Sequence, residues 1–164
     1  MLGMIKSHKK LFSLNTAIYT VYFTAMLDRL NFYGIQASLL IMLYKTFHLS
    51  DDKSIAIFGV YSTLGFCLPI IGGMIADKLL NHAKAVKIGL LFALVSFAVL
   101  LIKDTLLFHF IFIAIFIVGI SLFKSNNATY LGDLLDQNNM KSEKRFTYFY
   151  MWMNFGAIVG PFIY

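Results

Sequence analysis

The stretch LLFHFIFIAIFIVGISLFKSNNATYLGDLL, residues 106–135, decides the fold class of this chain. A helix of about 20 predominantly apolar residues is long enough to cross a lipid bilayer, and this run exceeds that length with Lys124 well inside it. Arg29 occupies a comparable place in the apolar run that begins near residue 15. A charge near the bilayer centre costs about 2.5–3.5 kcal/mol on insertion scales, so such residues usually face a watery cavity and serve a function.

The composition agrees with a membrane protein. Hydrophobic residues make up 59% of the 164 residues and charged residues 13%, whereas soluble domains carry roughly 25% charged residues. The net charge of +6 comes from short basic clusters between apolar runs, without the basic stripe that nucleic acid requires, so no nucleic-acid partner is expected. The single cysteine, Cys67, excludes an internal disulfide and a cysteine-based metal site.

The apolar runs predict an all-α, polytopic membrane protein with five spanning helices. These are expected at residues 15–47, 55–80, 84–102, 106–135 and 146–164, joined by polar segments at 48–53, 81–82, 103–104 and 136–145. The first run is long for one span, so this helix is expected to tilt or to protrude from the bilayer. Residues 1–14 are expected to form a cytoplasmic N-terminal segment.

The basic residues predict the orientation in the membrane. Nine of them lie near the N-terminus or the second and fourth joints, and three lie near the other joints: Lys6, Lys9, Lys10, Lys78, Lys84, Lys87, Lys141, Lys144 and Arg145 against Lys45, Lys53 and Lys103. By the positive-inside rule, this asymmetry favours a cytoplasmic N-terminus in a cytoplasmic (inner) membrane. With five spans, the last residue would lie outside.

Three polar side chains are expected at one depth. At about 1.5 Å per helical residue, Arg29, Lys124 and Asn154 all fall close to the middle of their spans, which is the arrangement that a central binding site requires. Arg29 and Tyr33 are four residues apart and share a helix face. A rigid guanidinium fork beside a phenol O–H donor suits a carboxylate group.

Four segments resemble the signatures of one family, the proton-dependent oligopeptide transporters of the major facilitator superfamily. Residues 25–34, AMLDRLNFYG, resemble its first-helix signature Glu-x-x-Glu-Arg-Phe-x-Tyr-Tyr-Gly. Residues 69–78, PIIGGMIADK, resemble the end of its second helix, which contains a version of the major-facilitator loop motif. Residues 122–126, LFKSN, resemble Phe-Lys-Pro-Asn of helix 4, and residues 149–157, FYMWMNFGA, resemble its helix 5 signature. The four segments occur in family order.

The resemblance implies a major-facilitator fold and proton-coupled uptake of di- and tripeptides across a lipid bilayer. Arg29 and Lys124 match positions that would hold the C-terminal carboxylate of the peptide. Tyr33 matches another peptide-binding position, and Asn154 would form a hydrogen bond with the peptide backbone. Tyr61 is the candidate for a tyrosine of helix 2 that contacts peptide in this family.

Two acidic residues match further positions of the family. Asp28 occupies the second acidic position of the helix 1 signature, which implies a role in proton coupling. Asp77 occupies the acidic position of the loop motif, which implies a role in stabilising the inward-closed, outward-open arrangement. Protons and small peptides are therefore the expected partners.

The chain departs from the family at other positions. Ala25 stands where the family has the first glutamate, one helical turn before Arg29 on the same face. Asp28 is a weak substitute, because adjacent residues point about 100° apart around a helix. Gln36 replaces an arginine and Ser125 replaces the helix 4 proline. These departures affect the expected proton coupling more than the expected peptide binding.

The length is a larger departure, because the family has at least 12 spans in two six-helix bundles. Residues 15–164 are expected to form a partial N-terminal bundle of five helices, with the C-terminal bundle absent. The chain is therefore interpreted as an N-terminal fragment of a transporter, truncated and inactive by itself or completed by a separately encoded C-terminal half.

Other interpretations stay open at this point. The chain could be a non-transporting membrane interaction or assembly protein, or a family member that carries another anionic or amino-acid solute. Arg29 could simply pair with Asp28, and Asn154 could bond to a neighbouring helix. Gly156 and Gly160 form a G-x-x-x-G pattern that usually packs helices. No nucleophile–base pair, metal cluster or phosphate loop is evident, so neither an enzyme nor a cofactor or metal is expected.

Overall fold

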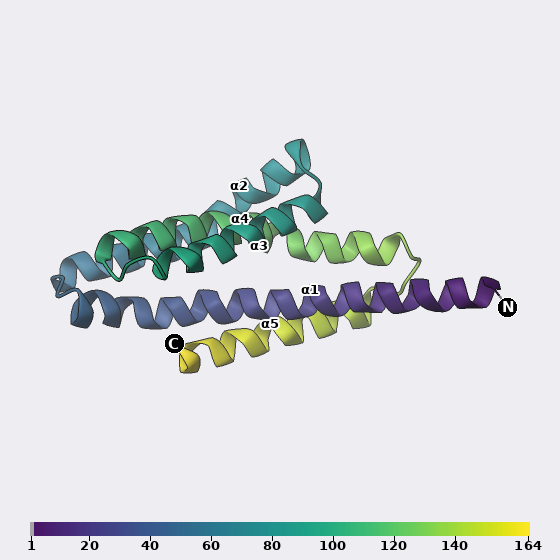
Figure 1. Ribbon diagram of the computed structural model, residues 1–164, viewed down its shortest axis with the longest axis horizontal. Coiled ribbons are helices and arrows are strands. Elements are labelled where there is room, and N and C mark those ends of the chain that lie inside the picture. Colours follow the sequence, from purple (N-terminus) through teal and green to yellow (C-terminus); the bar gives the residue numbers. More distant parts are fainter. Residues whose placement is uncertain (1) are drawn as a thin grey trace.

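The computed structural model describes the backbone of residues 2–164 and the side chains from Leu14 onward. The described chain is helical, without a strand, and its elements are α1 (Leu2–Ile41), the π-helical turn η1 (Met42–Thr46), α2 (Asp51–Leu79), α3 (His82–Leu100), α4 (Leu106–Asp136) and α5 (Glu143–Ile163). The helices run up and down along one long axis, with α5 beside α1 (Figure 1). The predicted all-α fold with five long helices is confirmed.

The helix bounds follow the apolar runs closely, except at the N-terminus. α2 to α5 begin and end within four residues of the predicted positions, but α1 begins at Leu2 rather than near residue 15. The hydropathy pattern locates where a helix could enter the membrane, and a helix can continue beyond that point into water. Residues 1–14 were predicted to form a cytoplasmic segment. The structure does not describe the side chains of residues 1–13, which include Lys6, Lys9 and Lys10.

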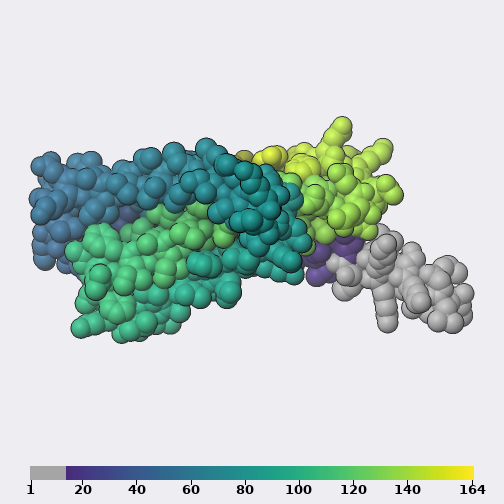
Figure 2. Space-filling view, turned by 90° about the horizontal axis from the view of Figure 1, so that it is seen from above, coloured from purple at the N-terminus to yellow at the C-terminus, as the bar shows by residue number. Residues whose placement is uncertain are grey.

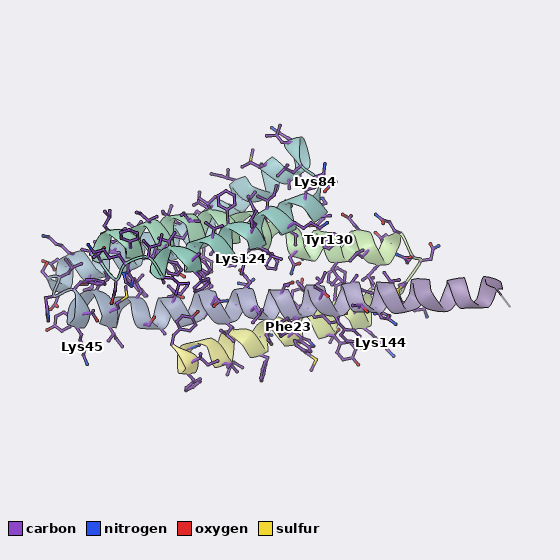
Figure 3. The ribbon with its side chains drawn as sticks, in the orientation of Figure 1. Phe23, Lys45, Lys84, Lys124, Tyr130 and Lys144 are labelled. Atoms are coloured by element: carbon purple, nitrogen blue, oxygen red, sulfur yellow. The ribbon has the colours of Figure 1, made fainter. Side chains whose placement is uncertain are left out.

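Alternating helix directions place the basic joints at one end of the bundle. Lys84, at the start of α3, and Lys144, at the start of α5, lie toward the end from which α1 begins, whereas Lys45 lies at the opposite end (Figure 3). Lys124 lies between these two ends. The segregation of basic residues that predicts the orientation is therefore present in the three-dimensional arrangement.

The five helices are not equally apolar. In the described part of the chain, α2, α3 and α4 are long and apolar enough to cross a membrane. α1 and α5 are helical but fall outside that group; α1 carries Asp28 and Arg29, and α5 opens with Glu143, Lys144 and Arg145. Five spans were predicted, so the apolarity of these two helices is lower than expected, and the polar groups of the candidate site come partly from them.

Glycines allow close contact between α1 and α5. A Cβ atom at Gly156 would overlap the backbone carbonyl of Met26, and one at Gly160 would overlap that of Leu30. The predicted role of this G-x-x-x-G pattern in helix packing is confirmed. Because the numbering rises together in both helices, α5 runs parallel to α1 with an offset of 130 residues.

Two apolar clusters fill the bundle, one on each side of the level that contains the charged residues. One cluster contains Phe32, Leu39, Tyr61 and Phe116, among others, and joins α1, α2 and α4. The other joins α1, α4 and α5 through Ile18, Val21, Tyr22, Ala25, Leu131, Leu135 and Phe149. In both α1 and α4 the residues between the two clusters include the charged ones, so Arg29 and Lys124 lie at the same level of the bundle.

Candidate functional site

Lys124 is the centre of a partly buried polar and aromatic cluster. Its Nζ atom donates a hydrogen bond to the backbone carbonyl of Gly65 at 3.3 Å. The same ammonium lies 4.1 Å from the centroid of the Phe32 ring and 4.9 Å from that of Phe66. Cation–π contacts of this kind contribute about 2 kcal/mol or more when the cation is desolvated, so α1, α2 and α4 all hold the lysine in place.

The sequence of α2 explains why the Gly65 carbonyl is available. In an α-helix this oxygen would accept a hydrogen bond from the backbone N–H four residues later, and that residue is Pro69, which lies inside α2 and has no N–H. The ammonium of Lys124 takes the place of the missing donor. The absence of a side chain at Gly65 also admits the Phe32 ring, which a Cβ atom there would overlap.

Arg29 and Asp28 bring two further charges to this level. Nε of Arg29 lies 4.0 Å from Oδ2 of Asp28, with the two side chains 19% and 6% exposed. Asp28, Arg29 and Lys124 lie at one level between the two apolar clusters, and together they carry a formal charge of +1. The sequence left a pair between Asp28 and Arg29 open as an alternative, and the two side chains lie at ion-pair distance.

Asp28 is only partly satisfied by this arrangement. Its other oxygen, Oδ1, is buried and has no hydrogen-bond partner among the described residues. The side chain also lines a largely apolar cavity of about 290 Å³ between α1, α3 and α4, together with Thr24 and Asn31. A buried carboxylate with a free oxygen is a suitable place for a proton or for a donor from a ligand.

Tyr61 and Tyr33 both pack against Phe32. Tyr61 is 1% exposed, stacks on the Phe32 ring with centroids 5.4 Å apart, and donates its hydroxyl hydrogen to the Phe32 carbonyl at 3.1 Å. Tyr33 is half-buried and meets the same ring edge-on at 5.3 Å. In this arrangement Tyr61 positions the aromatic cluster, and a solute would reach it only if that hydrogen bond broke.

Asn154 lies apart from the charged cluster. It is exposed on α5, and no hydrogen bond among the described residues joins it to Arg29 or Lys124. The packing of Gly156 on Met26 places Asn154 alongside residue 24, which is about 7.5 Å nearer the basic end than Arg29 at 1.5 Å per residue. Helical side chains lean toward the N-terminus, so the long Arg29 side chain reduces that offset.

The predicted gating residue, Asp77, joins a network at the basic end. Oδ1 of Asp77 is 3.9 Å from Nε2 of His82, whose Nδ1 is 2.9 Å from Oδ1 of Asn126 on α4. Asn126 in turn donates to the carbonyl of Gly72 at 3.3 Å. The loop motif is therefore coupled to α4 two residues beyond Lys124. This connection was not predicted from the sequence.

Ala25 occupies the position where the resembled family has an acidic residue. Its side chain is 3% exposed and belongs to the apolar cluster with Leu131 and Phe149. A carboxylate at this position would enter an apolar contact, which is costly unless Arg29, one helical turn away, compensates its charge. Among the described residues at this level, Asp28 is the acid that accompanies the two cations.

Sequence reasoning missed the groups that hold Lys124. Phe32, Phe66 and Gly65 contribute the rings and the carbonyl. One signal was present in the sequence, because Pro69 follows Gly65 by four residues and must free its carbonyl. The partners of that carbonyl come from a distant helix and could not be read from the local pattern.

Among the described residues, three helices are long and apolar enough to cross a membrane, and a charged level lies between two apolar clusters. This combination is typical of a polytopic membrane protein of the transporter class. Residues 6–163 match the family model described as Major Facilitator Superfamily, and the chain belongs to that superfamily.

Relatives support this assignment and the resemblance to peptide transporters. The chain is 32% identical to "Uncharacterized transporter YclF" of Bacillus subtilis (strain 168), covering 98% of this chain and 34% of that protein. It is 28% identical to "Dipeptide and tripeptide permease A" of Serratia proteamaculans (strain 568), covering 88% and 29%. The crystal structure of peptide transporter POT in complex with sulfate superposes with a TM-score of 0.78 at 28% identity, covering 89% and 31%. The chain thus spans about a third of the length of these relatives.

Proposed function

We propose that this chain provides the cation-bearing part of the substrate site in a proton-coupled di- and tripeptide symporter of the cytoplasmic membrane. The observation that carries the proposal is the placement of Arg29 from α1 and Lys124 from α4 at one partly buried level between the two apolar clusters. The names of relatives that are dipeptide and tripeptide permeases support the substrate class. The basic end of the bundle supports a cytoplasmic N-terminus.

The charge of the cluster matches a peptide terminus. Asp28, Arg29 and Lys124 together carry +1, and one carboxylate neutralises that charge. Lys124 uses one N–H on Gly65, and an ammonium has three donors, so two remain for a ligand. Arg29 is 19% exposed and can offer its fork to the second carboxylate oxygen. Tyr33 and Asn154 would contact the rest of the peptide.

Proton coupling in this proposal involves Asp28, because Ala25 offers no acid. The proton would reside on the unpaired Oδ1 oxygen. Asp77 would act at a distance, through His82 and Asn126, on the position of α4. Movement of this bundle against a second one would complete alternating access, as in transporters built from repeats.

The test compares a labelled dipeptide with its C-terminal amide. The full chain is reconstituted in vesicles, and equilibrium binding is measured for the native sequence and for Lys124→Gln, Arg29→Gln and the control Lys84→Gln, which removes a charge at the basic end. The dipeptide should bind about 10–100-fold better than the amide, because charge-assisted hydrogen bonds contribute about 1.5–3 kcal/mol. Each cluster variant should abolish this preference, and the control should keep it.

The outcomes separate peptide transport from the alternatives. Equal binding of acid and amide, or no binding of either, would overturn the proposal. Competition by a simple monocarboxylate as strong as that by the dipeptide would assign another anionic solute. Proton coupling is tested separately, since dipeptide uptake should follow an imposed pH gradient and stop when a protonophore collapses it.

A further inference from the structure

A second concave site lies at the basic end of the bundle, away from the charged cluster. It is a cavity of about 880 Å³ between the middle of α1, the α4–α5 connection and the start of α5. Its lining consists of Tyr19, Tyr22, Met140, Lys141, Glu143, Lys144, Arg145, Tyr148 and Trp152. The α4–α5 connection and the first turn of α5 project at this end of the molecule as a yellow-green surface (Figure 2).

A buried hydroxyl group points to the chemistry of the missing ligand. Tyr22 is 2% exposed, and its hydroxyl has no hydrogen-bond partner of good geometry among the described residues. The neighbouring group is the guanidinium of Arg145, which is close enough to donate a weak hydrogen bond to the Tyr22 oxygen. A guanidinium can only donate, so the Tyr22 hydrogen is left without an acceptor. Buried polar groups normally find a partner, and an acceptor that satisfies both groups would be an anion.

The formal charge of the lining also favours an anion. Lys141, Lys144 and Arg145 contribute three positive charges, and the carboxylate of Glu143 removes one. The net charge of +2 and the mixture of ammonium, guanidinium and phenol donors match the several oxygens of a phosphate group.

The surrounding aromatic side chains identify the source of that phosphate. Tyr19, Tyr148 and Trp152 are 62%, 55% and 37% exposed around the cavity. Tyrosine and tryptophan rings with basic residues beside them are typical of the headgroup level of a membrane, where anionic lipids of the cytoplasmic leaflet attract basic segments. This end of the bundle also carries Lys84 (Figure 3).

We infer that this cavity binds the phosphodiester headgroup of an anionic phospholipid, with Arg145 and the Tyr22 hydroxyl as its donors. The site is separate from the charged cluster, because Tyr22 precedes Arg29 by seven residues, about 10.5 Å along α1. The inference depends only on the membrane location of the chain and does not require peptide transport.

Trp152 provides a direct measurement, since it lines the cavity and is the only tryptophan in the sequence. The full chain is placed in phosphatidylcholine vesicles that contain brominated phosphatidylglycerol or, separately, brominated phosphatidylcholine, and quenching of its fluorescence is recorded. Phosphatidylglycerol should bind about tenfold more strongly than phosphatidylcholine at low salt, the factor that 1.4 kcal/mol gives. Arg145→Gln and Tyr22→Phe should each reduce this preference at least about threefold.

Matched variants and a soluble anion complete the experiment. Lys84→Gln removes a charge at the same end but outside the cavity and should leave the preference unchanged. Tyr22→Phe keeps the ring in the core and removes an unpaired hydroxyl, so it should preserve folding. Equal quenching by both lipids, or a preference that Arg145→Gln and Tyr22→Phe leave intact, would overturn the inference. Displacement of the lipid by inorganic phosphate at equal concentration would show a site for a soluble anion and would overturn the lipid assignment.

Discussion

Substitution of Pro69 by alanine should stabilise the chain and at the same time loosen Lys124. Proline in a helix interior is about 3 kcal/mol less favourable than alanine, in part because the Gly65 carbonyl loses its helical donor. The Lys124 ammonium compensates with a hydrogen bond of 3.3 Å. Because that length is at the long end for such bonds, its contribution lies at the low end of the charged range, about 1.5 kcal/mol. The expected net gain in the free energy of unfolding is therefore about 1–2 kcal/mol.

The assay is a double-mutant cycle on the detergent-solubilised full chain, followed by circular dichroism during denaturation. Pro69→Ala is combined with Lys124→Met, which keeps the length of the side chain and removes its donors. In the native background Lys124→Met leaves the Gly65 carbonyl without a donor, whereas with alanine at 69 the new N–H remains. The two substitutions should therefore couple by about 1.5 kcal/mol.

Pro161 supplies the matched control. It is the other proline of the sequence, and it lies exposed inside α5, away from the contacts of Lys124. The cycle of Pro161→Ala with Lys124→Met should be additive within about 0.5 kcal/mol. If the Pro69 cycle were equally additive, Lys124 would not be the substitute donor for the Gly65 carbonyl, and the explanation of the site would be wrong.

Two further predictions concern the packing and the ion pair. Gly119→Ala should destabilise the chain by about 1–3 kcal/mol, because the new Cβ would lie 2.8 Å from the Gly89 carbonyl oxygen. The control Gly59→Ala has nothing within 4 Å of the new Cβ and should be neutral or stabilising by up to about 1 kcal/mol. Equal shifts of the melting temperature in the two variants would contradict the predicted overlap at Gly119. In a second double-mutant cycle, Asp28→Asn and Arg29→Gln should couple by about 1–4 kcal/mol. Two unit charges at the observed separation of 4.0 Å interact by about 4 kcal/mol at an effective dielectric constant of 20. A coupling energy near zero would show that the two charges act independently.

The helices could be predicted because apolar length alone specifies them. The runs that contain α2, α3 and α4 are interrupted by short polar joints, so their ends are marked on both sides. The start of α1 lacks such a mark, because helical residues continue past the point where apolar residues begin. The boundary predicted there described the change in polarity, and the backbone does not follow it.

The candidate site could be predicted in level but not in detail. Counting residues along α1 and α4 gave Arg29 and Lys124 the same depth, and the two lie at one level. The same count included Asn154, which lies about 7.5 Å nearer the basic end, because the packing of Gly156 on Met26 sets the shift between α5 and α1. A local pattern contains no information on such a shift between separate helices.

The charge balance of the cluster determines how a proton and a substrate would influence each other. With Asp28 ionised, Arg29 and Lys124 leave a formal charge of +1 for an incoming carboxylate, and with Asp28 protonated they leave +2. A carboxylate is therefore bound more strongly by the protonated cluster, and by reciprocity the bound carboxylate favours a proton on Asp28. In the proposed symporter this coupling needs no glutamate at position 25, because both ligands act on the same two cations. Ala25 can then belong to the apolar cluster while proton and peptide still bind cooperatively.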